Sequence, residues 1–171
     1  HPHAILDRGV FREHPLGFIK INNSDWDIKH GVLFSKLPEY KALLNHYSGK
    51  ENWKNSEFAL KYFDFLKINK LKERNIKNYK NFLSEREKQI DKLFKSINKK
   101  GITPIKINKN KKLFIENIFV NLTKKNTLYF NNRGHHRLSI AKILGLKEIP
   151  VKLTVAKSIK NLEKFYLNYK N

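Results

Sequence analysis

Residues 127–155 constrain the fold more than any other part of the chain, because they predict a strand, a turn, a helix and a second strand in succession. Residues 127–130 combine a β-branched residue, a leucine and two aromatic residues, which favours a short buried strand. Leu138, Ala141 and Leu144 recur at helical spacing, and Gly145 offers a left-handed helix end. Residues 149–155 then predict another strand.

The turn of this segment carries the residues that we expect to bind a ligand. A glycine before a helix start leaves backbone N–H groups at the positive end of the helix dipole, an arrangement that binds phosphate. The predicted phosphate-binding residues are Arg133, Gly134, His135, His136 and Arg137. The alternatives are an ordinary turn glycine and side chains that only hydrogen-bond the helix start. A cation is unfavourable at the positive end of a helix unless an anion is nearby. The arginine at this helix start therefore favours the interpretation that the turn binds an anionic ligand.

Composition sets the class of protein. The chain has 171 residues, of which 40% are hydrophobic and 12% aromatic, so it should fold rather than stay disordered. It contains no cysteine, which excludes disulfides, thiolate metal sites and a cysteine nucleophile. No apolar run approaches the roughly 20 residues of a membrane span. We expect a cytoplasmic protein whose native start has been removed, since the sequence contains no methionine.

The net charge of +21 and the pI of about 10.1 suggest nucleic-acid binding. The excess is nearly all lysine, spread along the chain among asparagine and isoleucine, a pattern that an AT-rich genome also produces. Arginine, which recognises phosphate with a planar fork, is scarce. Nucleic acid therefore remains a partner to be tested, and the oligomeric state stays open.

The rest of the chain predicts helices at 38–48 and 56–68, each with an apolar stripe. Ser84 and Glu87 form a candidate capping box for a helix that ends near Gly101. We expect strands at 102–107 and 115–122, a hairpin turn at 123–126, and a packing helix from Ser158. We place a boundary after residue 83, with 1–83 as an N-terminal extension of loop and helix and 84–171 as the main domain.

The ordered motifs resemble the ParB/sulfiredoxin superfamily. Gly134-His135-His136-Arg137 with the helix behind it, followed by Ile149-Pro150-Val151, is similar to that superfamily's signature. Residues 93–107 are similar to the helix, turn and strand that open its domain. The resemblance covers roughly residues 84–156 and implies an α+β fold, with a small mixed sheet and flanking helices. Ser24-Asp25-Trp26-Asp27, with a later helix, Gly49 and Trp53, resembles an uncharacterised subgroup.

What the resemblance implies about activity is broad, because members include CTP-hydrolysing partition proteins, sulfiredoxins that use ATP, free-serine kinases and proteins labelled nucleases. They share a nucleotide phosphate tail held by the turn that matches residues 134–137. His135 stands where sulfiredoxins have their cysteine, so that reaction is excluded here. Arg133 replaces an aspartate that relatives often carry, which favours anion binding and disfavours direct transfer of kinase chemistry.

Catalysis would need carboxylates or a proton carrier in addition to the phosphate site. The candidate catalytic residues are His135, Asp25 and Asp27, with Glu116 as a further carboxylate. Asp25 and Asp27 flank Trp26, a combination able to hold Mg²⁺ or to act as a base; the alternative is a turn with a packing tryptophan. The histidines near the start fit no standard zinc spacing, and the metal stays unknown.

Three hypotheses remain open. The first is a Mg²⁺-dependent phosphotransferase, such as a small-molecule kinase, or a nucleotide hydrolase, using ATP, ADP or CTP. The second is a DNA-associated ParB-like module with nuclease or DNA-binding activity. The third is a nucleotide or anion sensor without catalysis.

Overall fold

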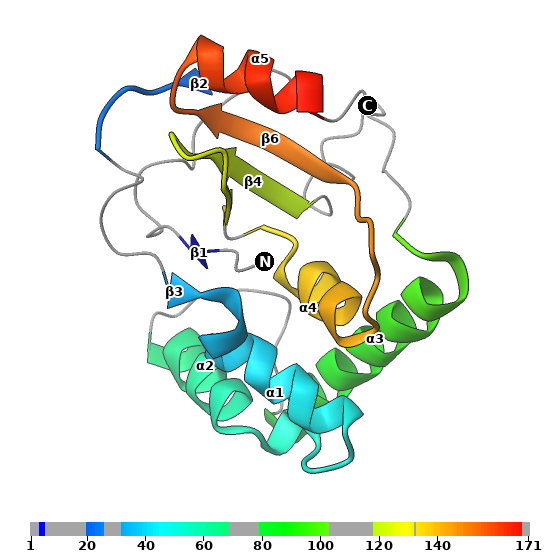
Figure 1. Cartoon of the computed structure of the whole chain (residues 1–171). Coiled ribbons are helices and arrows are strands. Elements are labelled where there is room, and N and C mark those ends of the chain that lie inside the picture. Colours follow the sequence, from blue (N-terminus) through cyan, green and yellow to red (C-terminus); the bar gives the residue numbers. More distant parts are fainter. Residues whose placement is uncertain are drawn as a thin grey trace, which may run out of the picture. The chain divides into compact units, whose positions relative to one another are not determined.

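The structure is a computed structural model that describes residues 4–5, 20–25, 32–68, 79–102, 118–131 and 133–168. The chain divides into two compact units, each assembled from separate stretches of sequence (Figure 1). The sheet unit comprises His1–Leu37, Thr103–His135 and Ile149–Asn171. The helical unit comprises Pro38–Ile102 and His136–Glu148. Neither unit follows the chain in a single run.

The sheet unit is built on a mixed sheet. Its described strands lie in the order β2-β6-β4-β5-β1-β3. β4 runs parallel to β6 and antiparallel to β5, so the sheet mixes both kinds of pairing. The strands are β1 (Ala4–Ile5), β2 (Lys20–Ile21), β3 (Val32–Leu33), β4 (Ile118–Leu122), β5 (Leu128–Phe130) and β6 (Val151–Ala156).

The predicted hairpin between β4 and β5 is confirmed. Thr123 donates its backbone N–H to the Thr127 carbonyl at 3.0 Å, and Asn126 donates to the Thr123 carbonyl at 3.0 Å. Asn126 has φ +56°, a left-handed conformation that asparagine tolerates better than most residues. The tight turn therefore sets the pairing of Leu122 with Leu128.

The core of the sheet unit is apolar along β4, β5 and β6. All five residues of β4 are buried, and Phe130 of β5 meets Phe34 edge to face at 5.3 Å between ring centroids. Phe34 belongs to the short 3-10 helix η1 (Phe34–Lys36), which follows β3. α5 (Ile159–Asn168) runs alongside β6 (Figure 1), and Ser158 caps it by accepting the Asn161 N–H at 3.2 Å.

The described N-terminal residues take part in this sheet. β1 pairs in parallel with β5, and β2 pairs in parallel with β6. The described residues of the N-terminal stretch thus pair with the strands that precede and follow the predicted turn.

The helical unit holds a separate core. Its helices are α1 (Pro38–Tyr47), α2 (Glu57–Ile68), α3 (Tyr79–Lys100) and all but the first residue of α4 (His135–Ile143), with the 3-10 helix η2 (Trp53–Asn55) between α1 and α2. Buried apolar residues from these elements form one cluster: Ala42, Leu43, Trp53, Ala59, Phe63, Leu83 and Ile90. Ile143 of α4 packs against this cluster, so the helix behind the predicted turn is anchored at its far end.

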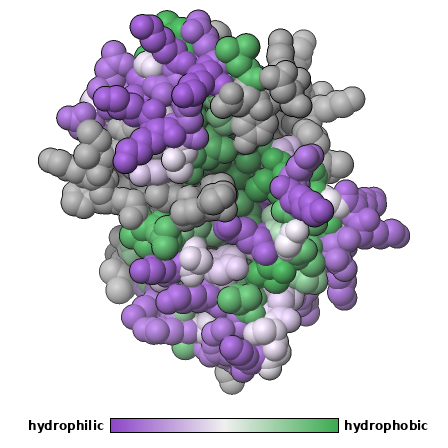
Figure 2. All heavy atoms as spheres, viewed as in Figure 1, coloured by the Kyte–Doolittle hydropathy of each residue, from purple (hydrophilic) through white to green (hydrophobic). Residues whose placement is uncertain are grey.

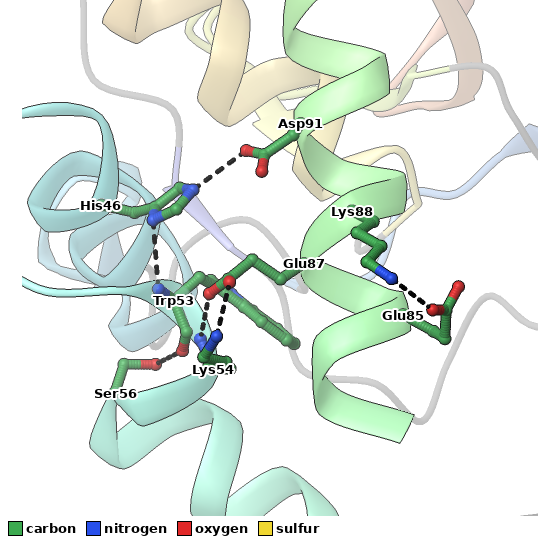
Figure 3. A network of polar contacts seen from close by, with 8 residues as sticks. All are labelled: His46, Trp53, Lys54, Ser56, Glu85, Glu87, Lys88 and Asp91. Atoms are coloured by element: carbon green, nitrogen blue, oxygen red, sulfur yellow. Dashed lines mark hydrogen bonds and ion pairs between the residues drawn. The ribbon is translucent and has the colours of Figure 1, made fainter. Parts of the chain in front are cut away.

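A network of polar contacts links α1, η2 and α3 (Figure 3). Trp53 donates its backbone N–H to His46 Nδ1 at 3.2 Å, which leaves the ring proton on Nε2. His46 Nε2 therefore donates to Asp91 Oδ1 at 3.0 Å, and the Tyr47 hydroxyl donates to the same oxygen at 3.3 Å. The Tyr47 ring also stacks on Phe94 at 3.8 Å between centroids. These contacts hold α1 against α3.

The predicted capping box of Ser84 and Glu87 is wrong. α3 begins at Tyr79, so Ser84 lies inside the helix. Glu87 instead accepts the Lys54 backbone N–H at 2.9 Å and pairs with Lys54 Nζ at 3.3 Å (Figure 3). The pattern of Ser84 and Glu87 is typical of a helix start. The Glu87 carboxylate nevertheless binds a backbone N–H of η2, a contact between distant residues that local spacing cannot predict.

The α+β prediction with a small mixed sheet and flanking helices is confirmed, as are the helices around 38–48 and 56–68. The predicted strand at 102–107 falls outside the described residues except for Ile102. The boundary after residue 83 stays a prediction; α3 spans both sides of it. No helix among the described residues combines the length and apolarity that crossing a membrane requires.

Tyr47 generates a test of the α1–α3 contact. Burial, followed by the Asp91 carboxylate, raises the pKa of the Tyr47 phenol well above its ordinary value of about 10. As the pH rises, the phenol ionises in the unfolded chain before it ionises in the folded protein. The stability that the buried, protonated phenol contributes is therefore complete below about pH 10 and is lost as the pH rises above it. We expect the free energy of unfolding, measured in urea, to fall more steeply between about pH 9 and pH 11 in the wild type than in Tyr47→Phe. At neutral pH the variant should lose about 1 kcal/mol. Parallel pH curves would contradict the contact.

Candidate functional site

The chain enters the predicted turn along a path fixed by β4. Asn131 donates its backbone N–H to the Phe119 carbonyl at 2.8 Å, and Phe119 donates to the Arg133 carbonyl at 3.2 Å. These bonds continue the β4–β5 ladder beyond the last residue of β5. The backbone that leads to Gly134 is thus held by the sheet.

Gly134 turns the chain from this ladder into α4. Its φ is +82°, in the left-handed region that glycine occupies without a steric penalty. α4 begins at the next residue, His135, and contains no acidic residue in its first turn. The predicted succession of strand, glycine turn and helix is confirmed. It directs the first N–H groups of a helix toward the turn, and these groups have no partner within the helix itself.

α4 is fixed by its other end. Leu138, Ser139, Ile140 and Ala141 are buried. Leu146 donates its backbone N–H to the Ala141 carbonyl at 2.9 Å, next to Gly145 at φ +66°. Such a left-handed closure ends a helix sharply. The first turn of α4 therefore projects from a well-anchored helix.

The five predicted phosphate-binding residues are accessible. Arg133 is exposed, and Gly134 to Arg137 are partly exposed, so solvent reaches the turn. His135, His136 and Arg137 each have a contact within the protein in addition to their place on the helix. The division between the two units falls between His135 and His136. We treat the five residues as one site because they are adjacent in sequence at the start of one helix.

Two cations lie beside Phe119 in the sheet unit. The Arg133 guanidinium carbon is 5.8 Å from the centroid of the Phe119 ring, a cation–π distance. Lys152 is the register partner of Phe119 on β6, so both side chains stand on the same face of the sheet. Burial lowers the pKa of the Lys152 ammonium. The approach to the turn therefore has a positive local charge.

A cluster of three polar side chains beside the turn was missed by sequence reasoning. Thr154 donates its hydroxyl to Asn121 Oδ1 at 2.7 Å, and Asn131 Nδ2 lies 2.9 Å from Thr154 Oγ1 and 3.3 Å from Asn121 Oδ1. The cluster sits where the β4–β6 register shifts, between Val120 and Asn121. It holds the side chain of Asn131, two residues before Arg133. The sequence signal was Asn121, a lone amide inside an apolar strand.

Asp25 does not lie near the turn. Its carboxylate is 3.6 Å from Lys157 Nζ, which also donates to the Ser24 carbonyl at 2.6 Å. Lys157 follows β6 and donates its backbone N–H to Leu122, the last residue of β4. Arg133 bonds to Phe119, near the first residue of β4. The structure thus places Asp25 at the opposite end of β4 from the turn and does not bring it together with His135.

The remaining predicted carboxylates, Asp27 and Glu116, lie outside the described residues, as do Trp26 and the histidines of the first 30 residues. Within the part of the chain that the structure describes, no group of three His, Asp or Glu side chains is arranged to hold a metal ion. The turn itself thus offers backbone amides, two imidazoles and two guanidinium groups.

Comparison with known proteins gave one family match. A family model described as ParB N-terminal domain matches residues 54–167, two thirds of the chain, including the whole turn. Comparison with the curated proteins and with the solved structures gave no match.

The conformation of Gly134 generates a test that needs no ligand. A Cβ at φ +82° is strained, so Gly134→Ala should lower the free energy of unfolding by about 1–2 kcal/mol. Gly134→Asn should lose less, because asparagine tolerates this region. Urea denaturation of the three proteins measures both effects. An alanine variant as stable as the wild type would contradict the left-handed turn.

Proposed function

The chain belongs to the ParB N-terminal domain family, and from this premise we propose that it binds the phosphate groups of a nucleotide at Arg133–Arg137. The observation that carries the proposal is the left-handed Gly134 directly before the first turn of α4. Family members differ in activity, so the chemistry must be argued from the site.

The backbone supplies the first half of the proposed binding. The first N–H groups of α4 carry the partial positive charge of the helix dipole, and glycine lets a phosphate approach the chain closely. Because Gly134 has no side chain, that approach is not blocked by a Cβ. Ladder bonds through Phe119 hold the incoming strand, so little ordering of the backbone is needed on binding.

Side chains supply the second half. His136 and Arg137 stand in the first turn of α4, and no carboxylate is present in that turn. Arginine at a helix N-terminus is unfavourable in isolation, and a bound phosphate converts this cost into a charge-assisted bond. Arg133 adds an exposed guanidinium on the approach. The site is thus complementary to a di- or triphosphate, for which ATP, ADP and CTP are the candidates.

Binding is better supported than catalysis. Mg²⁺ usually reaches such sites coordinated by the phosphates and one or two carboxylates, and it would neutralise charge during phosphoryl transfer. Of the three carboxylates predicted for this role only Asp25 is among the described residues, and it pairs with Lys157 at the far end of β4. His135 remains the candidate proton carrier at the turn. We therefore propose nucleotide-phosphate binding first, with phosphotransfer or hydrolysis as an activity to be measured on the bound nucleotide.

Calorimetry with ATP, ADP, CTP and GTP, with and without Mg²⁺, tests the proposal. We expect at least one nucleotide to bind, and Arg137→Ala to weaken that binding about 10- to 100-fold through loss of a charge-assisted bond. Lys160→Ala on α5 removes the same charge from an exposed position and should leave the dissociation constant unchanged. No binding of any of the four nucleotides, or equal losses in the two variants, would exclude this site.

A second measurement tests whether Asp25, which lies at the other end of β4 from the turn, contributes to nucleotide binding. Asp25→Asn should leave the dissociation constant of the bound nucleotide within about twofold of the wild type, because the effect of an exposed charge that far away is screened by salt. The same calorimetric titration measures it. A strong change would place Asp25 at the nucleotide, in conflict with its position beside Lys157.

A further inference from the structure

α3 has two opposite faces. Leu83, Ile90 and Ile97 recur every seven residues and are buried. Lys88, Lys92, Lys95 and Lys99 are exposed and spaced by four, three and four residues. At 3.6 residues per turn these lysines fall within an arc of about 60°, directly opposite the buried positions. The exposed lysines therefore form a row along the outer face of the helix.

Three of these four lysines form no ion pair with the described residues, because the acidic residues of α3 pair with Lys88 or with groups on other elements. The helix contains three of them, Glu85, Glu87 and Asp91. Glu85 pairs with Lys88 at 2.8 Å, Glu87 with Lys54, and Asp91 accepts from His46 (Figure 3). Asp91 also accepts from the Tyr47 hydroxyl. In the stretches that the structure describes, no carboxylate forms an ion pair with the remaining lysines, Lys92, Lys95 and Lys99. We call these three residues the lysine row.

The row is hydrophilic and contains no apolar anchor. On the face shown in Figure 2, hydrophilic side chains project where α3 runs in Figure 1. The apolar side of α3 is buried, so the helix cannot lay an apolar face into a bilayer. Arginine and aromatic residues, which dominate protein–protein contacts, are absent from the row.

The spacing of the row suits a polyphosphate chain. Lys92 to Lys95 and Lys95 to Lys99 rise about 4.5 Å and about 6 Å along the helix axis. Phosphates on one strand of duplex DNA follow each other at about 3.4 Å along the duplex axis, a comparable scale that long lysine side chains can match. Lysine contacts phosphate as a point charge, and such contacts carry no base information.

We propose that the lysine row of α3 binds the phosphate backbone of double-stranded nucleic acid without regard to sequence. This surface is separate from the turn at Gly134 and does not depend on the proposed nucleotide site. Lys99 also suits the negative end of the helix, but Lys92 and Lys95 lie too far from that end to serve it.

The test compares two variants of equal net charge. The row variant carries Lys92→Gln, Lys95→Gln and Lys99→Gln; glutamine preserves helix propensity. The control carries Lys125→Gln, Lys160→Gln and Lys164→Gln, which are exposed in the sheet unit. Fluorescence anisotropy with two unrelated DNA duplexes measures affinity over a salt series, and circular dichroism verifies the fold of each variant.

We expect the row variant to bind both duplexes about 10-fold or more weakly at about 50 mM salt, and its log–log salt dependence to become shallower by up to about 2.7. The control variant should keep most of the wild-type dependence of DNA affinity on salt concentration. Nucleotide affinity, measured by calorimetry, should be unchanged in both variants, which separates this test from that of the turn.

Three results would overturn the proposal. Equal losses in the row variant and the control would show that the overall charge acts without a defined surface. A wild type that binds one duplex and not the other would exclude sequence-independent contact. Selective loss of binding to polyglutamate, or to phosphatidylcholine vesicles with about 30% phosphatidylserine, with DNA binding intact, would assign the row to an acidic protein or to a membrane.

Discussion

Two backbone hydrogen bonds of Phe119 determine the conformation on which the proposed site depends. The Phe119 carbonyl accepts the Asn131 N–H, and the Phe119 N–H donates to the Arg133 carbonyl. The sheet therefore continues to hold the chain after β5 has ended. Without these bonds, Gly134 would be a flexible link and the start of α4 would have no fixed approach. With them, a rigid strand leads through one left-handed residue into a helix whose far end is closed and packed. The conformation of the proposed site thus follows from sheet pairing.

The positive charge of the protein is arranged differently in different places. At the turn, two arginines and two histidines lie next to one another in sequence at one helix start, where the backbone dipoles add positive charge. Along α3, lysines are laid out in a line with their carboxylate neighbours occupied. The first arrangement suits a compact, highly charged ligand, and the second suits an extended one. Net charge alone does not distinguish the two.

Local patterns in the sequence were sufficient for the elements around the turn. Apolar spacing and left-handed glycines predicted α1, α4 and the strands on either side of Gly134, because those signals act within a few residues. Contacts between distant residues were not accessible in this way. Glu87 binds Lys54, 33 residues away, and Thr154 joins Asn121 across two strands. The distance between Asp25 and the turn likewise followed from strand order, which spacing along the chain does not encode.

The amide of Asn121 is fully buried, and its Nδ2 group lacks a hydrogen-bond partner. An unmet donor of this kind costs about 1–3 kcal/mol, so an apolar residue of similar size would make the strand itself more stable. Such a replacement would also remove the oxygen that orients Thr154 and Asn131. A substitution of Asn121 that raises the melting temperature would thus leave the side chains beside the turn less ordered. Natural proteins often retain such a compromise between stability and function.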